Sequence, residues 1–439
     1  MNAFSLPSSL LLGSATASLQ IEGGDRNNSW YEWSCRPGKT RDGVNSFNGN
    51  AHWRLMKEDV ALMKRMNMKI YRMSVEWARI EPAKGQFDEK AIRHYLREIS
   101  MLEKAGIRVM LTAHHFSNPL WFETRGSWEH RDSAADFASF IELLAERFGP
   151  HVADWCTINE PNIYLMMGWF SGDWPPGKKG DIFGYIRAAK NMLRAHRMAY
   201  HIIHGTRATQ GFGDTRVGMA LHLRYMESAG RGFLDRFAVR ISERLFHGIF
   251  VKGMIEGKRI FPLAILPQRR RGTFADFFGI NYYTRDMVSS TPEPAKMFVS
   301  TKVKEGSVKN DLGWEIYPEG IYHLAKRYHS RYGLPICITE NGIADAKDEK
   351  RAQFIYDHLY QLRRLCDEGV PVLCYCHWTN MDNFEWAEGY TARFGLVEVN
   401  YKTMKRTVRR SGRFYADICR GNAVTDAMIA KYFGKGGRR

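Results

Sequence analysis

Residues 155–161 have the sequence Trp155-Cys156-Thr157-Ile158-Asn159-Glu160-Pro161. The first four residues are apolar or β-branched, which is typical of a buried β-strand, and the last three are polar or end the strand. A carboxylate at the end of such a strand is costly unless it has a partner or a function. The stretch therefore predicts a strand that carries Asn159 and Glu160 into a functional site.

The same pattern recurs along the chain, where short apolar runs alternate with stretches that have apolar residues three and four apart. The predicted strands are residues 11–18, 70–77, 109–116, 155–161, 217–223, 277–284, 336–342 and 372–379, and the predicted helices include residues 53–66, 89–105, 133–148, 185–204, 320–332 and 349–368. Eight strands that alternate with helices predict an α/β fold, a single closed (β/α)8 TIM barrel. An open doubly wound sheet is the competing topology, but the first strand-to-helix turn lacks its Gly-x-Gly-x-x-Gly motif.

Polar and aromatic residues gather at the C-terminal ends of these predicted strands. In a barrel those ends face a common opening, so residues that are distant in the sequence meet there. We therefore expect the active site at the C-terminal ends of the strands, with contributions from Gln20, Arg72, His115, Asn159, Glu160, Asn281, Tyr283, Glu340 and Trp378. His114 points away from its neighbour His115 and is expected to be structural.

The composition is that of an ordinary globular protein. Hydrophobic residues make up 44% and charged residues 25% of the 439 residues, and no linker divides the chain. The expected organisation is one catalytic domain over residues 1–439, with a basic tail from about residue 421. The net charge is +17, and residues 401–439 hold eleven Lys and Arg against two Asp. Because no nucleic-acid motif accompanies this charge, it predicts a solvated basic surface and no nucleic-acid partner.

The sequence carries no signal for secretion, for a membrane span or for a metal site. No basic residue precedes the short apolar run at residues 10–12, and no segment approaches the roughly 20 apolar residues of a membrane span. The seven cysteines lie mostly inside apolar patterns. In Cys374-x-Cys376-His377, adjacent residues of a strand point to opposite faces, which disfavours a metal site. We expect a cytoplasmic protein without metal or cofactor.

Glu340 lies in a second stretch of the same kind, residues 336–341 (Ile-Cys-Ile-Thr-Glu-Asn). Cleavage of a glycosidic bond without a metal needs two carboxyl groups beside the bond. One protonates the leaving oxygen, and the other stabilises or traps the oxocarbenium-like carbon. Strands four and seven of a barrel both end at the opening, so Glu160 and Glu340 can face each other across it.

Two motifs resemble the signatures of glycoside hydrolase family 1, the β-glucosidase and β-galactosidase family: residues 157–161 (Thr-Ile-Asn-Glu-Pro) and residues 338–342 (Ile-Thr-Glu-Asn-Gly). Supporting stretches follow the order of the family at residues 13–17, 20–23, 71–74, 278–283, 313–318, 382–386 and 393–396, so the resemblance covers about residues 8–415. It implies a retaining, exo-acting β-glycosidase of the β-glucosidase type that acts on small β-glycosides. Activity on β-galactosides or β-fucosides, transglycosylation and the oligomeric state stay open.

The resemblance also implies the roles of the catalytic residues. Glu340 is the expected nucleophile, which forms a covalent glycosyl intermediate, and Glu160 is the expected acid/base. Arg72 and Tyr283 are expected beside Glu340, where Arg72 favours the ionised carboxylate, and Asn281 supports the pair. Glu160 must hold a proton near neutral pH and needs a raised pKa. Retention requires the two carboxyl groups to lie about 5–5.5 Å apart.

The sugar site needs fixed hydrogen-bonding groups and an aromatic platform, because a pyranose has hydroxyl groups around its rim and an apolar face. The resemblance implies hydrogen bonds to the non-reducing sugar from one group of residues, stacking on Trp378, and a cavity wall that contains Trp314 and Phe394. The expected hydrogen-bonding residues are Gln20, His115, Asn159, Glu385 and Trp386.

The chain departs from the pattern of the family at Leu19, Phe116 and Asn162. Asn162 is expected toward the leaving group, so the leaving-group preference stays open. A 6-phospho-β-glycosidase is the alternative within the class, but Glu385 places a negative charge where the phosphate would bind. A carbohydrate-binding protein without catalysis is the alternative from another class, and the presence of both carboxylates argues against it. The same residues, Gln20 and Glu385, would bond to the hydroxyl that distinguishes glucose from galactose. The choice between these two sugars therefore also stays open.

Overall fold

The centre of the molecule is a closed ring of eight parallel strands. The computed structural model describes residues 1–266, 268–269, 271–293 and 299–434. The ring has the order β6-β5-β4-β3-β2-β10-β9-β7, and pairing of β6 with β7 closes it. All eight predicted strands are present, and the α/β class is confirmed. They are β2 (Leu11–Ala15), β3 (Ile70–Ser74), β4 (Arg108–His114), β5 (Asp154–Asn159), β6 (Arg216–Ser228), β7 (Phe278–Ser290), β9 (Ile336–Asn341) and β10 (Val372–Trp378).

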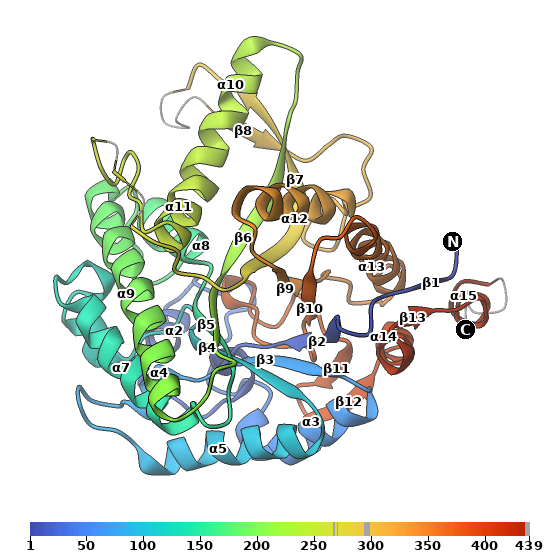
Figure 1. Cartoon of the computed structure of the whole chain (residues 1–439), viewed down its shortest axis with the longest axis horizontal. Coiled ribbons are helices and arrows are strands. Elements are labelled where there is room, and N and C mark those ends of the chain that lie inside the picture. Colours follow the sequence, from blue (N-terminus) through green and yellow to red (C-terminus); the bar gives the residue numbers. More distant parts are fainter. Residues whose placement is uncertain (267, 270, 294–298, 435–439) are drawn as a thin grey trace.

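Helices surround the strands (Figure 1) and bury their apolar faces against them. In α5, for example, Ile92, Ile99 and Leu102 are fully buried, as the helical spacing predicts. The longer helices are α3 (His52–Arg65), α5 (Glu89–Lys104), α7 (Ser133–Phe148), α9 (Ile182–Thr209), α10 (Phe233–Ser242), α11 (Ile249–Ile255), α12 (Glu319–Tyr332), α13 (Arg351–Asp367) and α14 (Arg410–Gly421). The predicted helix 185–204 is longer in the structure because the Asp181 carboxylate caps its N-terminus, accepting from the Gly184 amide at 2.7 Å.

Two strands continue beyond their predicted ends. β6 and β7 stay paired as far as Ser228 and Val288, and β8 (Val299–Lys302) adds to β7 in the antiparallel direction. This extension has its own small apolar cluster, in which Met226 and Val288 pack with Ala238 of α10. The strands therefore do not end at the opening of the ring, and α10 and β8 project from it (Figure 1).

Most of the predicted basic tail folds against the rest of the chain. β13 (Ala423–Val424) pairs with β1 (Phe4–Ser5), which brings the two ends of the chain to one side of the molecule (Figure 1). In the following α15 (Asp426–Phe433), Tyr432 is buried, and its carbonyl oxygen accepts a hydrogen bond from Arg410 at 2.7 Å. Residues 435–439 of the predicted tail lie outside the described residues.

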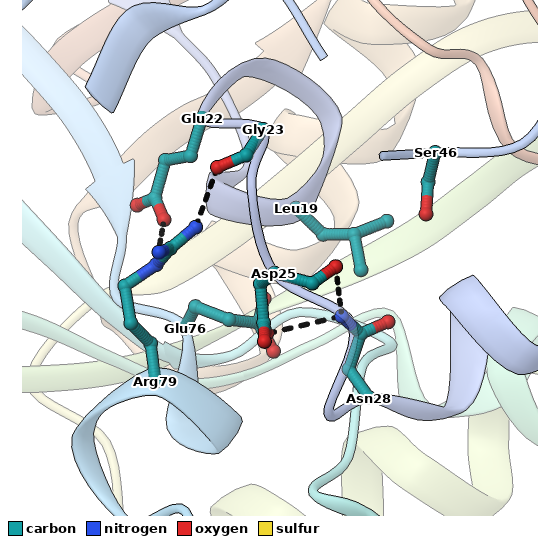
Figure 2. A pocket seen from close by; sticks show the side chains of 8 residues that line it. All are labelled: Leu19, Glu22, Gly23, Asp25, Asn28, Ser46, Glu76 and Arg79. Carbon is teal, nitrogen blue, oxygen red and sulfur yellow. Dashed lines mark hydrogen bonds and ion pairs between the residues drawn. The ribbon is translucent and has the colours of Figure 1, made fainter. Parts of the chain in front are cut away.

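A buried polar network holds the segment that follows β2 (Figure 2). The predicted strand 11–18 ends at Ala15, and α1 (Ser18–Ile21) begins at Ser18. Arg79 of α4 (Trp77–Ile80) donates through Nε to Glu22 Oε2 at 3.0 Å and through Nη2 to the Gly23 carbonyl at 2.8 Å. Because Glu22 directly follows α1, these bonds fix the helix that carries Gln20.

Glu76 is buried beside the cavity in Figure 2, whose volume of about 10 Å³ suits a single water molecule. Ser18 donates to Glu76 Oε2 at 3.1 Å, and Ser117 donates to Oε1 at 2.8 Å. Burial, together with the negative charges of Asp25 and Glu22, raises the pKa of Glu76 to about 8. The Glu76 carboxyl is therefore buried and joins the segments that carry Ser18 and Ser117.

Replacing Glu76 by Gln should change how stability depends on pH. The contribution of the wild-type carboxyl is fully present below its unfolded-state pKa near 4.5 and is lost as the pH rises through about 8. Between these values, the wild type should lose about 1.4 kcal/mol of stability per pH unit relative to Glu76→Gln. Denaturant unfolding at pH 5, 6, 7 and 8 measures this difference, with exposed Glu58→Gln as the control. A difference that stays constant with pH would contradict the raised pKa.

Candidate active site

A cavity of about 320 Å³, the size of a small-molecule site, lies at the C-terminal ends of the ring strands. Most of the predicted site residues line it, namely His115, Glu160, Tyr283, Trp314, Glu340, Trp378, Glu385, Trp386 and Phe394. The others lie buried behind this lining and are hydrogen-bonded to it, namely Gln20, Arg72, Asn159 and Asn281. The structure therefore brings all the predicted site residues together.

Glu340 lies near the end of β9 and is only 3% exposed. Arg72 of β3 donates through Nη1 to Glu340 Oε1 at 2.5 Å, and the Tyr283 hydroxyl donates to Oε2 at 2.6 Å. Both oxygens of this carboxylate are thus held from other strands of the ring, Oε2 from the neighbouring β7 and Oε1 from β3, which is not adjacent to β9. Arg72 is completely buried and also donates through Nη2 to Asn159 Oδ1 at 2.7 Å.

Some contacts raise the pKa of Glu340 and others lower it. Burial, the largest influence, raises its pKa, and the Glu160 carboxylate adds to this rise. Arg72 and Tyr283 lower the pKa of Glu340, as expected from the sequence, but they do not outweigh burial. The net effect is a pKa of Glu340 above the usual range of a carboxyl group.

Glu160 follows β5 directly and precedes α8 (Pro161–Leu165). Its backbone is left-handed, with φ 42° and ψ 55°, which is strained for a residue with a side chain and a following proline. The surrounding structure holds it there, since its amide donates to the Ala220 carbonyl of β6 at 2.8 Å. Its Oε1 accepts a hydrogen bond from Asn281 Nδ2 at 2.7 Å and lies 3.2 Å from His222 Nδ1. The carboxyl is thereby directed from the end of β5 into the cavity.

Gln20 lies behind Glu385. Its Nε2 donates to the Phe384 carbonyl at 2.8 Å, to Asn383 Oδ1 at 3.2 Å and to Glu385 Oε2 at 3.4 Å. Within the part of the chain that the structure describes, Gln20 Oε1 has no hydrogen-bond partner. A buried acceptor of this kind is available to a donor on a ligand.

The ring nitrogens of His115 differ in their contacts. Arg72 can only donate to Asn159 Oδ1, so the Asn159 amide nitrogen points to His115 Nε2, 3.0 Å away. His115 Nε2 must then accept, and the ring proton of the neutral side chain lies on Nδ1. Among the described residues, Nδ1 has no partner and is available to a ligand. His114 instead bonds to Asn118 Oδ1 at 2.9 Å, in agreement with its predicted structural role.

Aromatic rings form two walls of the cavity. On one side the His115 ring lies nearly parallel to Trp378 and Trp386, with centroids 5.9 and 6.0 Å away. On the other, Trp314 lies 5.9 Å from Tyr283 and 6.3 Å from Phe394. Such walls suit a ligand that has an apolar face.

Glu385 and Trp386 lie in the loop after β10, which a buried carboxylate anchors. Asp382 accepts hydrogen bonds from Arg409 at 2.8 Å and from Arg393 at 3.2 Å. Burial, with the charge of Glu340 as the next cause, raises the pKa of Glu385 to about 8. Burial therefore opposes the ionised form of Glu385 that the sequence analysis assumed.

Several cavity residues were not predicted. They are Arg41, Phe116, Ile163, Met166, Met167, Trp174, His222, Arg224, Leu312, Ala387 and Glu388. The sequence could have indicated His222 as a site residue, because it lies at the end of the predicted strand 217–223 like the other site residues. Asn162 was expected toward the leaving group, but it is buried behind the cavity lining, and its amide donates to the His222 carbonyl at 2.7 Å.

Among the described residues, no group of three or more His, Cys, Asp or Glu could hold a metal ion. No helix in the same ranges is long and apolar enough to cross a membrane. All seven cysteines are free thiols.

Tyr283→Phe removes the hydroxyl that donates to Glu340 Oε2. Because this bond lowers the pKa of Glu340, its loss should raise that pKa above about 7 and reduce the ionised fraction at neutral pH. An NMR titration of carboxyl-labelled Glu measures the change. Tyr225→Phe is the matched control, since its ring packs on Tyr317 outside the cavity lining. An unchanged Glu340 titration in Tyr283→Phe would contradict this account of the site.

The family model described as "Glycosyl hydrolase family 1" matches residues 2–424. The chain is 33% identical to beta-glucosidase A of Thermotoga maritima, over 97% of this chain and 100% of that protein. The structure of the beta-glycosidase from Pyrococcus horikoshii has a TM-score of 0.90 and 35% identity, and covers 98% of each chain. The Thermotoga maritima beta-glucosidase in complex with glucoimidazole has a TM-score of 0.89 and 32% identity, over 96% of this chain and 99% of that chain. The chain therefore belongs to glycosyl hydrolase family 1 and is a β-glycosidase.

Proposed function

We propose that this β-glycosidase is a retaining, exo-acting enzyme of the β-glucosidase type, with Glu340 as nucleophile and Glu160 as acid/base. The observation that carries the proposal is the difference between the two carboxyl groups that line one cavity. Glu340 is bonded to a cation, Arg72, at 2.5 Å, whereas Glu160 is bonded to an amide, Asn281, at 2.7 Å. A nucleophile must be ionised and an acid must hold a proton, so the cation favours this division of roles.

The first step transfers the sugar to the enzyme. A carboxylate oxygen of Glu340 attacks the anomeric carbon as the bond from that carbon to the leaving oxygen breaks. Glu160 gives its proton to the leaving oxygen, so the aglycone departs as a neutral alcohol. The products are an α-linked glycosyl ester on Glu340 and an ionised Glu160.

The second step reverses these roles. Glu160 takes a proton from a water molecule, which attacks the anomeric carbon on the face opposite Glu340, and the ester bond breaks. The sugar leaves with its original β configuration, and both carboxyl groups return to their starting states. A sugar hydroxyl can replace the water, so transglycosylation competes with hydrolysis at high acceptor concentration.

The coupling between the two carboxyl groups supports this sequence of states. The charge of Glu160 is one cause of the raised pKa of Glu340. When Glu160 holds a proton, that repulsion is absent, and Arg72 and Tyr283 favour ionised Glu340. Arg72 and Tyr283 thus favour the ionised Glu340 that the first step requires.

The non-reducing sugar fits between Trp378 and the polar floor of the cavity. Gln20 Oε1 and His115 Nδ1, which have no partner among the described residues, would bond to its hydroxyl groups. Glu385, Asn159 and Trp386 complete the predicted hydrogen-bonding set. Glucosides are the first substrates to test, with β-galactosides and β-fucosides as the alternatives.

A 6-phospho-β-glycosidase needs a free cation for the phosphate. The raised pKa of Glu385 weakens the argument from its negative charge. However, the two arginines that line the cavity are already paired, Arg41 with Glu388 at 2.8 Å and Arg224 with Asp286 at 3.0 Å. The exposed Arg41 pair is weak, but the pairing of Arg224 with the buried Asp286 disfavours a phosphorylated substrate.

The remaining assignments follow from the fold and the composition. We assign the ring of strands and its helices to the (β/α)8 TIM barrels, as one catalytic domain over residues 1–439 without a cofactor. The free thiols favour a reducing compartment, so we assign the protein to the cytoplasm.

A panel of p-nitrophenyl β-glycosides, together with alkyl β-glycosides as substrates with poor leaving groups, tests the activity. The wild type should release nitrophenol from the β-glucoside, and Glu160→Ala should lower kcat/KM for substrates with poor leaving groups by about 10²–10⁴-fold, the usual contribution of a general acid. Glu340→Ala should be inactive because no covalent intermediate can form. Absence of turnover by folded wild type on every β-glycoside would reject the proposal.

Azide distinguishes the two roles. It should rescue Glu160→Ala by attacking the glycosyl intermediate, with a β-glycosyl azide as product. It should rescue Glu340→Ala by replacing the nucleophile, with an α-glycosyl azide as product. The opposite pairing of products would reverse the two assignments.

A further inference from the structure

His222 of β6 contacts the proposed acid/base but has no part in the reaction described above. Its Nδ1 lies 3.2 Å from Glu160 Oε1, and its Nε2 lies 3.3 Å from Nε of Arg224. The side chain is 6% exposed and lines the cavity. The ring therefore lies between a carboxyl group and a cation.

Arg224 determines which nitrogen of His222 carries the proton. An arginine is always protonated, so Arg224 Nε can only donate, and His222 Nε2 must accept. A neutral imidazole that accepts at Nε2 has its proton on Nδ1. His222 Nδ1 is consequently the donor to Glu160 Oε1.

Three contacts keep this arrangement in place. Arg224 Nη1 donates to both carboxylate oxygens of Asp286, at 3.0 and 3.1 Å. Asn162, two residues after Glu160, donates to the His222 carbonyl at 2.7 Å. The His222 ring also stacks on Tyr283, with centroids 5.8 Å apart and an angle of 20°.

Two donors therefore converge on one oxygen of Glu160. Oε1 receives hydrogen bonds from Asn281 and from His222, which leaves Oε2 as the oxygen that can carry the catalytic proton. We propose that His222, held in the Nδ1-protonated form by Arg224, is a positioning residue that directs the proton of Glu160 toward the leaving group. This inference rests on the proposed function, because it assigns His222 a role through the acid/base.

The role predicts an effect that depends on the leaving group. Dinitrophenolate departs with little protonation, whereas an alkoxide departs only as it receives a proton. A misdirected proton should therefore impair cleavage of alkyl β-glucosides much more than cleavage of 2,4-dinitrophenyl β-glucoside. Loss of packing alone would impair both substrates equally.

The test compares kcat/KM for these two substrates in His222→Leu, His222→Asn and wild type. His222→Leu should raise the ratio of dinitrophenyl to alkyl activity by about tenfold, near the upper value of one hydrogen bond between uncharged groups. His222→Asn places an amide donor near the position of Nδ1 and should restore most of the wild-type ratio. His323→Leu makes the same change at an exposed histidine of α12 and should leave the ratio unaltered.

Nitrogen NMR of histidine-labelled protein tests the proton position directly. The His222 signals, identified by their loss in His222→Asn, should show a protonated Nδ1 and an unprotonated Nε2 in the wild type. Arg224→Met should abolish this preference. An unprotonated Nδ1 in the wild type, or an unchanged substrate ratio in His222→Leu, would overturn the inference. A wild type that cleaves neither substrate would instead reject the proposed function.

Discussion

The buried ion pair between Arg72 and Glu340 is the interaction on which the rest of the site depends. Neither charge is stable alone inside the ring, because a buried ion without a partner costs several kcal/mol. Arg72 also orients residues other than Glu340. Its second terminal nitrogen donates to Asn159, and the orientation of Asn159 determines which ring nitrogen of His115 carries the proton. One cation on β3 thereby positions a carboxylate on β9, an amide on β5 and an imidazole after β4.

The closed ring of strands fixes the positions of these side chains. Parallel strands carry the site residues to one end at fixed spacing, and the surrounding helices bury the outer faces. Glu160 departs from regular geometry, because its left-handed backbone lies where strand becomes helix. The amide contact with Ala220 and the side-chain contacts with Asn281 and His222 hold that strained turn. The position of Glu160 therefore depends on β6 and β7, as the position of Glu340 depends on β3.

Much of this arrangement could be predicted from the sequence. Apolar runs that end in polar residues locate the strands, and the end of each run locates residues such as Asn159 and Glu340. The extensions of β6 and β7 beyond the ring could not be predicted. They form by pairing with each other and with β8, and the sequence pattern does not mark where the ring ends. Arg224 lies in that continuation. The charge state of Glu385 was also beyond prediction, since it depends on burial and on carboxylates far away in the sequence.

The central claim is that Glu340 becomes covalently bonded to the sugar, and trapping that intermediate tests it most directly. In 2,4-dinitrophenyl 2-deoxy-2-fluoro-β-glucoside, the fluorine slows both steps by destabilising the oxocarbenium-like transition states, while the good leaving group restores the first step. The account predicts one equivalent of released dinitrophenolate, a mass increase of one fluoroglucosyl group, and its location on Glu340 after peptide mapping. Turnover of ordinary glucosides without any adduct from this reagent, or an adduct on another residue, would contradict it.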